Sequence, residues 1–245
     1  MAVILCHSLK GGTGNTLLAA HIAMGLSEAG ADVTVLTTSE FDPLPLHFAL
    51  PPATQLPSLS ASSDQSVVVS GISLRHEPHA AADPDFMTML ADLGFLAPGE
   101  DRVLVVDVAA AQLDLARMLL PVAHVHLSTL VPYPECLTLL PDYTDARIGC
   151  WGERTAVVLN ALDETRRLAR HTSAFFRELL GNRLLGKVRR DEAVSESLAM
   201  LQTLERYAPA SAALSDLRAL AASLFPLLDA PIAPISTIPN RSQVA

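Results

Sequence analysis

Apolar segments and helical patterns alternate along most of the chain. The apolar segments are short and rich in residues that favour β-strands. They are Ala2–Cys6, Val33–Thr38, Ser66–Leu74, Val103–Asp107, His124–Leu130, Thr155–Asn160 and Leu184–Val188. Because helical patterns separate these predicted strands, the predicted fold is α/β, with a doubly wound and mostly parallel sheet.

A predicted helix joins the first two strands. Its apolar residues recur at helical spacing: Leu18, Ile22, Leu26 and Ala29. Gly30 follows as a helix C-cap just before the second strand. The strand, helix and second strand therefore form a right-handed βαβ unit.

Two other regions differ in composition or pattern from the alternating strands and helices. The segment Pro51–Ser66 is rich in Pro, Ser, Ala and Gln, which predicts a long loop or a partly ordered insertion. Helical spacing returns over 208–228, and the prolines that follow predict an extended tail. We therefore expect one domain over residues 1–229 and a Pro-rich tail over residues 230–245 that is disordered or orders on a partner.

Composition, charge and cysteine count limit the kinds of protein that this chain can be. The chain has 245 residues, of which 50% are hydrophobic, which is enough for one large core. A net charge of −9 argues against general nucleic-acid binding, because phosphate contacts need a basic surface. Three cysteines at unrelated spacings favour a reducing compartment. With no secretion signal and no apolar stretch long enough to span a bilayer, we expect a cytoplasmic protein.

The run from Lys10 to Thr16 reads Lys-Gly-Gly-Thr-Gly-Asn-Thr, and it lies between the first strand and the first helix. This is where a phosphate-binding loop occurs, because glycines let backbone N–H groups surround an anion at the positive end of a helix. Thr16 offers a hydroxyl for phosphate-bound magnesium. An ordinary loop has lysine after the third glycine, where this chain has Asn15. The leading Lys10 marks a deviant form, in which that lysine serves a dimer.

Two more strands end in polar residues. Asp107 follows Val103–Val106 and places a carboxylate at the carboxyl end of a central strand, where ligands bind in such sheets. Combined with the glycine loop, it predicts a magnesium–nucleotide site; alone, it is equally a loop cap. Asn160 ends the strand Thr155–Asn160, and its amide suits the edge of an adenine or, equally, a strand-to-loop turn.

The three elements in this order resemble the deviant-Walker family of dimerising ATPases, of the MinD and ParA type. The segments 187–198 and 207–213 resemble more closely the BcsQ-type accessory proteins of bacterial cellulose secretion. The resemblance implies a single-domain P-loop NTPase fold of the MinD-like (SIMIBI) class and a homodimer with ATP and magnesium between its subunits. It places at the nucleotide Lys10, Gly11, Gly12, Thr13, Gly14, Asn15, Thr16, Leu17, Asn160 and Arg189, with Thr16 and Asp107 near magnesium.

The chain departs from the hydrolysing members at two places. Asn15 replaces a lysine, and losing that charge costs about 1.5–3 kcal/mol of phosphate binding. The second strand ends in Thr37-Thr38-Ser39-Glu40, so the expected carboxylates are missing and Asp42 is displaced by three residues. Phosphoryl transfer needs a positioned water, so we expect slow or absent hydrolysis, with Lys10 and Asp42 as catalytic candidates.

Three functions stay open. The first is an ATP-dependent homodimeric scaffold of a cellulose synthase complex, cytoplasmic or peripheral at the inner face of the membrane. The second is an active positioning ATPase that uses a substitute carboxylate. The third is a pseudo-ATPase that dimerises without nucleotide. The arginines at 166, 167 and 170 have acids interleaved, so we expect no specific nucleic-acid partner.

Overall fold

The computed structural model describes residues 2–97, 102–144, 151 and 154–228. The predicted tail at residues 230–245 lies outside this part. An eight-stranded sheet runs through the molecule, with the strand order β3-β4-β2-β5-β1-β6-β7-β8. All strand pairs are parallel except β3 with β4. The strands are β1 (Ala2–Cys6), β2 (Asp32–Thr37), β3 (Val67–Val69), β4 (Ile72–His76), β5 (Arg102–Asp107), β6 (Val125–Leu130), β7 (Thr155–Leu162) and β8 (Leu184–Arg189).

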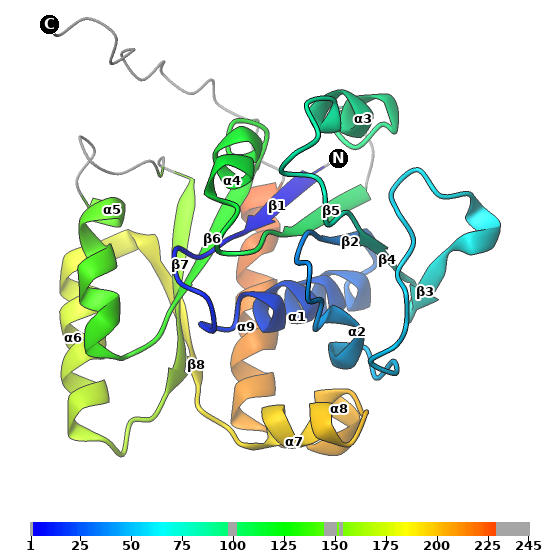
Figure 1. The fold of residues 1–245 in the computed structure, drawn as a ribbon. Helices are drawn as coiled ribbons and strands as arrows, with labels where there is room; N and C mark the ends of the chain where they lie inside the picture. Colours follow the sequence, from blue (N-terminus) through cyan, green and yellow to red (C-terminus); the bar gives the residue numbers. More distant parts are fainter. Residues whose placement is uncertain (1, 98–101, 145–150, 152–153, 229–245) are drawn as a thin grey trace, which may run out of the picture.

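Helices cover both faces of the sheet (Figure 1). One layer contains α1 (Asn15–Glu28), α2 (Leu44–His47), α7 (Ala193–Ala199), α8 (Leu204–Tyr207) and α9 (Ala212–Leu228). The other contains α3 (Phe86–Asp92), α4 (Leu113–Leu119), α5 (Leu140–Thr144) and α6 (Arg167–Leu180). Short 3-10 helices occur at Ser63–Gln65, Pro134–Leu139 and Gly181–Arg183. The predicted doubly wound α/β fold is confirmed.

Six of the seven predicted strands form single strands close to their predicted bounds. The prediction of one strand over Ser66–Leu74 was wrong, because this segment is a hairpin of β3 and β4. Ser70 and Gly71 both have positive φ, at 51° and 79°, which is the backbone of a two-residue hairpin turn. Val69 then pairs with Ile72 across the turn.

Strand β1 shows why the sequences of the central strands are continuous runs of apolar residues. Ala2, Ile4 and Cys6 point into the core beneath α1 and α9. Val3 and Leu5 point into the second core, on the opposite face of the sheet. Both faces are covered, so every side chain of the strand is buried. The carboxyl end of β1, where the glycine loop begins, is therefore fixed from two sides.

Helix α9 packs against α1 and β8. Its residues Leu214, Leu217, Leu220, Ala221 and Leu224 are buried in the same core as α1. A Cβ added at Gly25 of α1 would lie 2.5 Å from the Cβ of Ala221, so the two helices touch closely. The apolar face of the predicted last helix is thus used for packing. In the described part of the chain, no helix has the length and apolar character needed to cross a membrane.

Four histidines are buried within this fold. His7 and His126 lie beside Trp151, and the ring centroids of His126 and Trp151 are 4.4 Å apart. His21 and His47 meet edge to face, with centroids 6.2 Å apart. Burial lowers the pKa of His21 and His126 to about 3 and that of His7 and His47 to about 4. All four rings are therefore neutral in the folded protein at pH 7.

Because of these four histidines, we expect the free energy of unfolding to fall in acid. Their folded pKa values lie below the unfolded value of 6.5, so their stabilising effect is complete above pH 6.5 and is lost as pH falls toward 4 and 3. Near pH 5, each is expected to cost about 2 kcal/mol of unfolding free energy. Urea unfolding as a function of pH tests this. His21→Leu should reduce the slope below pH 6.5 relative to the parent protein. Equal slopes in the variant and the parent would contradict the prediction.

Candidate functional site

The glycine loop connects β1 to α1 at the carboxyl edge of the sheet. Gly12 and Gly14 have φ of 75° and 94°, a conformation that side chains disfavour. A Cβ at Gly14 would also lie 2.0 Å from Nδ2 of Asn160. Glycine is therefore required at position 14 by backbone conformation and by space. Gly14 is also the N-cap of α1, so the positive end of the helix lies at the loop.

Buried hydroxyl groups fix the loop to the sheet. The Oγ1 of Thr129, near the end of β6, lies 2.6 Å from Ser8 Oγ and 2.7 Å from Thr13 Oγ1. The backbone N–H of Thr129 donates to Ser8 Oγ over 2.8 Å. All three side chains are buried, so these hydrogen bonds are shielded from water. The loop is consequently held in its shape by the protein alone.

Asn15 connects the loop to the two central strands. Its Nδ2 donates to the carbonyl oxygen of Cys6 over 2.9 Å and to Oδ1 of Asp107 over 2.7 Å. Its Oδ1 accepts a hydrogen bond from Ser8 Oγ over 3.2 Å. The amide at the position of the missing lysine therefore has partners in β1, in β5 and in the loop.

Asp107 is a buried carboxylate at the end of β5. Burial raises its pKa to about 6, while its contacts with Thr16 and Asn15 oppose this rise. The charge of Asp42 raises it further. Among the residues that the structure describes, its buried Oδ2 has no hydrogen-bond partner. Such an oxygen, beside a threonine hydroxyl, is chemically suited to a cation or its water.

The segment after β2 carries no carboxylate at its start. Thr38 Oγ1 instead donates to Gln112 Oε1 over 2.5 Å, and Gln112 Nε2 donates back to the Thr38 carbonyl over 3.1 Å. Asp42 lies nearby, because Thr37 hydrogen-bonds to it and its charge acts on Asp107. Burial raises the pKa of Asp42, and its Oδ1 accepts the N–H of Leu44 at the start of α2.

A cavity of about 450 Å³ opens beside the loop. Residues 10–17 line it together with Asp107–Ala110. The segment after β2 contributes Ser39, Phe41, Pro43 and His47, and Phe41 is 86% exposed. Helix α7 adds Val194 and Leu198. Phe41, Val194 and Leu198 were not predicted as site residues from the sequence. The signal present there was the apolar pair Val194 and Leu198, four residues apart.

The structure brings most of the predicted site residues to this cavity, from Lys10 to Leu17 and at Asp107. Asp42 is not among the residues that line it, and two others lie elsewhere. Asn160 is buried beneath the loop, where its Nδ2 donates to the carbonyl of Thr13 over 2.7 Å. Arg189 pairs with Asp216 of α9, with Nη2 and Oδ1 2.8 Å apart. Neither is among the residues that line the cavity. Their contact with a nucleotide stays a prediction.

Solved structures with this fold come from several organisms. A ParA family ATPase from Chlorobium tepidum TLS is 22% identical, with a TM-score of 0.69, over 90% of this chain and 97% of that one. MinD from Pyrococcus horikoshii OT3, complexed with Mg-ADP, is 16% identical, with a TM-score of 0.66, over 92% and 96%. A variant of Cyanothece McdA in complex with ATP is 16% identical, with a TM-score of 0.64, over 91% and 96%.

These identities establish the fold alone, and it is the fold of MinD and ParA proteins. No curated protein sequence gives a significant match to the chain. The model of one protein family, described as "Cellulose biosynthesis protein BcsQ", matches residues 87–224, which is more than half of the chain. The glycine loop, the buried aspartate and the doubly wound sheet therefore occur here in a member of the cellulose biosynthesis protein BcsQ family.

Proposed function

We propose that this protein is an ATP-binding, weakly or non-hydrolysing homodimeric scaffold of a bacterial cellulose synthase complex, placed in the cytoplasm or peripherally at the inner face of the membrane. The observation that carries the proposal is Asn15. A neutral amide occupies the position of the phosphate-binding lysine and hydrogen-bonds to Asp107 and to the Cys6 carbonyl. The cellulose context rests on family membership.

Nucleotide binding is supported by the loop and the cavity. Backbone N–H groups of a glycine loop at a helix N-terminus bind phosphates without a lysine side chain. Relatives in fold have been solved with Mg-ADP and with ATP. The unpartnered Oδ2 of Asp107 and the Thr16 hydroxyl fit magnesium, which these two residues would hold through the nucleotide. Bound magnesium would neutralise phosphate charge.

Weak hydrolysis follows from the polar groups around the reacting phosphate. Asn15 carries no charge to stabilise the charge that develops in phosphoryl transfer. Directly after β2, the hydroxyl and carbonyl of Thr38 are already bonded to Gln112, so they are not free to orient a water. Both features slow the chemical step more than they weaken binding. A dimer that does not hydrolyse its nucleotide stays assembled, as a scaffold must.

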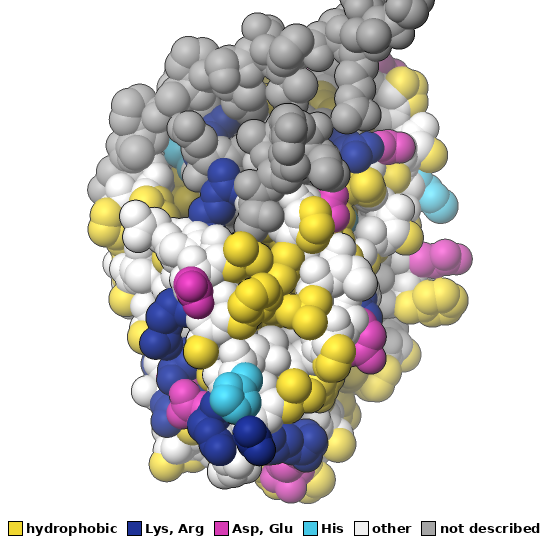
Figure 2. Space-filling view, turned by 90° about the vertical axis from the view of Figure 1, so that its left-hand side faces the viewer, with side chains coloured by type: hydrophobic (Ala, Val, Ile, Leu, Met, Phe, Trp, Pro, Cys, Tyr) yellow, Lys and Arg dark blue, Asp and Glu magenta, His cyan; other side chains and the backbone are white. Residues whose placement is uncertain are grey.

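A scaffold also needs a surface for other subunits. On α6, the large apolar side chains Leu168, Phe175 and Leu179 are 55%, 47% and 42% exposed. Figure 2 shows the face that carries α5 and α6, where apolar side chains gather at the centre with Lys and Arg below and to the left. An apolar centre with a charged rim is typical of protein interfaces. This surface supports the proposal that cellulose synthase accessory subunits bind here.

A positioning ATPase is the second candidate, and Asp42 favours it. This carboxylate contacts Thr37 and acts on Asp107, although it is displaced in sequence. Its charge acts on Asp107, which makes it the candidate for the missing catalytic carboxylate, although it is not among the residues that line the cavity. Its Oδ1 accepts the N–H of Leu44, so Oδ2 is the oxygen that would orient a water.

One experiment separates the candidates. The purified protein is denatured to extract its nucleotide, its mass is measured by light scattering, and Mg-ATP is followed for product over hours. Intact ATP in a dimer supports the scaffold. Steady release of ADP, abolished by Asp42→Asn, supports the positioning ATPase. A dimer that is empty and indifferent to nucleotide overturns both and indicates the pseudo-ATPase.

Replacing Asn15 by lysine tests the neutral amide directly. Asn15→Lys adds a charge at the phosphates and should tighten ATP binding about tenfold, as expected for one charged hydrogen bond. Hydrolysis should stay slow, because the segment after β2 still begins with Thr38 and not with a carboxylate. Isothermal titration measures the affinity, and Asn15→Gln is the uncharged control. An unchanged affinity in Asn15→Lys would show that phosphates do not lie at this position.

Replacing Lys10 tests whether this residue holds the proposed dimer together. If this lysine contacts the phosphates of the partner subunit, Lys10→Ala should give monomers in Mg-ATP at a concentration where the parent is a dimer. Light scattering with and without Mg-ATP is the measurement. Arg170→Ala, an exposed cation on α6, is the matched control and should leave the mass unchanged. A Lys10→Ala dimer of full mass would rule out the trans contact.

A further inference from the structure

The nucleotide cavity has one wall that the glycine loop does not supply. Among the described residues beyond β8, Val194 and Leu198 of α7 line it. They are apolar and half-buried. The loop offers N–H groups to phosphates, whereas an apolar helix face suits the flat, weakly polar face of a nucleobase. On the proposed function, α7 is therefore the wall against which the base lies.

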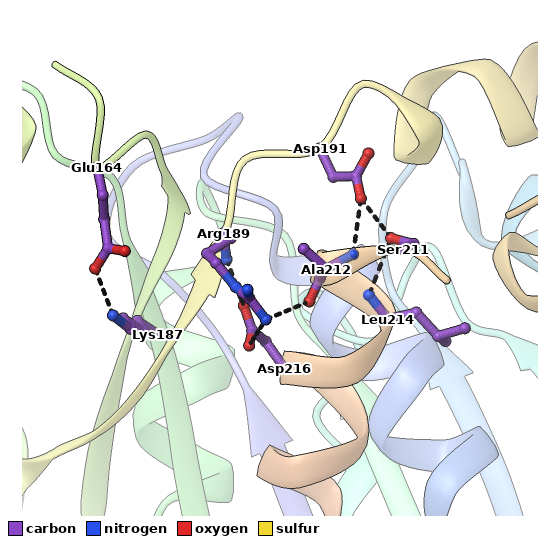
Figure 3. A network of polar contacts seen from close by, with 8 residues as sticks. All are labelled: Glu164, Lys187, Arg189, Asp191, Ser211, Ala212, Leu214 and Asp216. Carbon is purple, nitrogen blue, oxygen red and sulfur yellow. Dashed lines mark hydrogen bonds and ion pairs between the residues drawn. The ribbon is translucent and has the colours of Figure 1, made fainter. Parts of the chain in front are cut away.

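We propose that Asp191 is a positioning residue for the base: it does not touch the nucleotide, but ties α7 to the start of α9. Its Oδ1 accepts the N–H of Ala193, the first residue of α7, over 3.0 Å. Its Oδ2 accepts Ser211 Oγ over 2.7 Å and the N–H of Ala212, the first residue of α9, over 3.0 Å. One carboxylate thus holds the beginnings of two helices, and Figure 3 shows its contacts with Ser211 and Ala212 at α9.

The carboxylate is well suited to this task. The hydrogen bonds from Ser211 and Ala193 lower the pKa of Asp191, so it is ionised wherever the protein is folded near neutral pH. Ser211 Oγ in turn accepts the N–H of Leu214 over 3.2 Å, which caps the first turn of α9. Charge-assisted hydrogen bonds of this kind are stronger than neutral ones. Figure 3 shows Asp191, Ser211 and Leu214 in this continuous chain of contacts.

A second connection holds the strand that leads to α7. The N–H and Nε of Arg189 donate to Asp216 Oδ2 over 2.9 and 2.8 Å, so the end of β8 is fixed to α9 one turn further along. The Arg189 contacts anchor the strand, and those of Asp191 anchor the helix that follows it. Removing Asp191, and not Arg189, is therefore the change that moves α7 while β8 stays in place.

The path from the loop to α7 runs through two helices. The loop continues into α1, which begins at Asn15, and α1 packs closely on α9 at Gly25 and Ala221. Asp191 then connects α9 to α7. The phosphate end and the base end of the cavity are consequently located by the same pair of helices. Removing Asp191 releases the base end alone.

The test compares two ligands that share the phosphates and differ in the base. ATP and inorganic tripolyphosphate are titrated, with magnesium, into the full-length parent and Asp191→Ala. The variant should lose about tenfold in ATP affinity, because α7 is no longer held in place against the base and must be ordered when ATP binds. Its affinity for tripolyphosphate should stay within about twofold of the parent, because the loop is unchanged. Thermal unfolding confirms that the variant is folded.

Two further variants sharpen the result. Ser211→Ala keeps the carboxylate and removes its partner just before α9, so it should reproduce part of the ATP loss. Glu192→Ala removes one acid at the adjacent position, whose partner is Arg190, and should change neither affinity. Equal losses for ATP and tripolyphosphate in Asp191→Ala would overturn the positioning role, as would no loss for either. A parent that binds neither ligand would instead overturn the proposed function itself.

Discussion

The side-chain amide of Asn15 is the contact on which the site depends. It donates two hydrogen bonds, to the ends of β1 and β5, and accepts one from the loop. A lysine here would only donate, whereas an amide also accepts, so Asn15 bonds the Cys6 carbonyl, the Asp107 carboxylate and the Ser8 hydroxyl together. The glycine loop is therefore fixed in shape by contacts within the protein, and the entropy cost of ordering it belongs to folding.

Helix α9 connects the glycine loop and α1 to the other walls of the cavity. It packs on α1 through apolar side chains and holds β8 and α7 through Asp216, Ser211 and the N–H of Ala212. Apolar burial supplies most of the stability of this corner, while the polar contacts determine where α7 lies. Four buried neutral histidines show that the same interior tolerates polar rings as long as they are uncharged.

The sequence predicted the central strands and the loop, because burial on both faces and a run of glycines leave local patterns. It did not predict the hairpin at Ser70 and Gly71, since two short strands of one composition read as a single long one. It also did not find the contacts of Asp191 with residues twenty and more positions away. Asn160 and Arg189 illustrate the same limit: their residue types were informative, but their partners are set by tertiary packing.

The two edges of the sheet have a consequence for how copies of the protein meet. Strand β3 has three residues and runs antiparallel to its neighbour, so this edge offers little backbone to a new strand. At the other edge, the N–H of Arg189 is occupied by Asp216. Growth of the sheet from molecule to molecule is therefore limited at the β3 edge, and the β8 edge lacks one free backbone donor for it. Contacts between copies are accordingly expected to rest more on side-chain surfaces than on the pairing of these two strand edges.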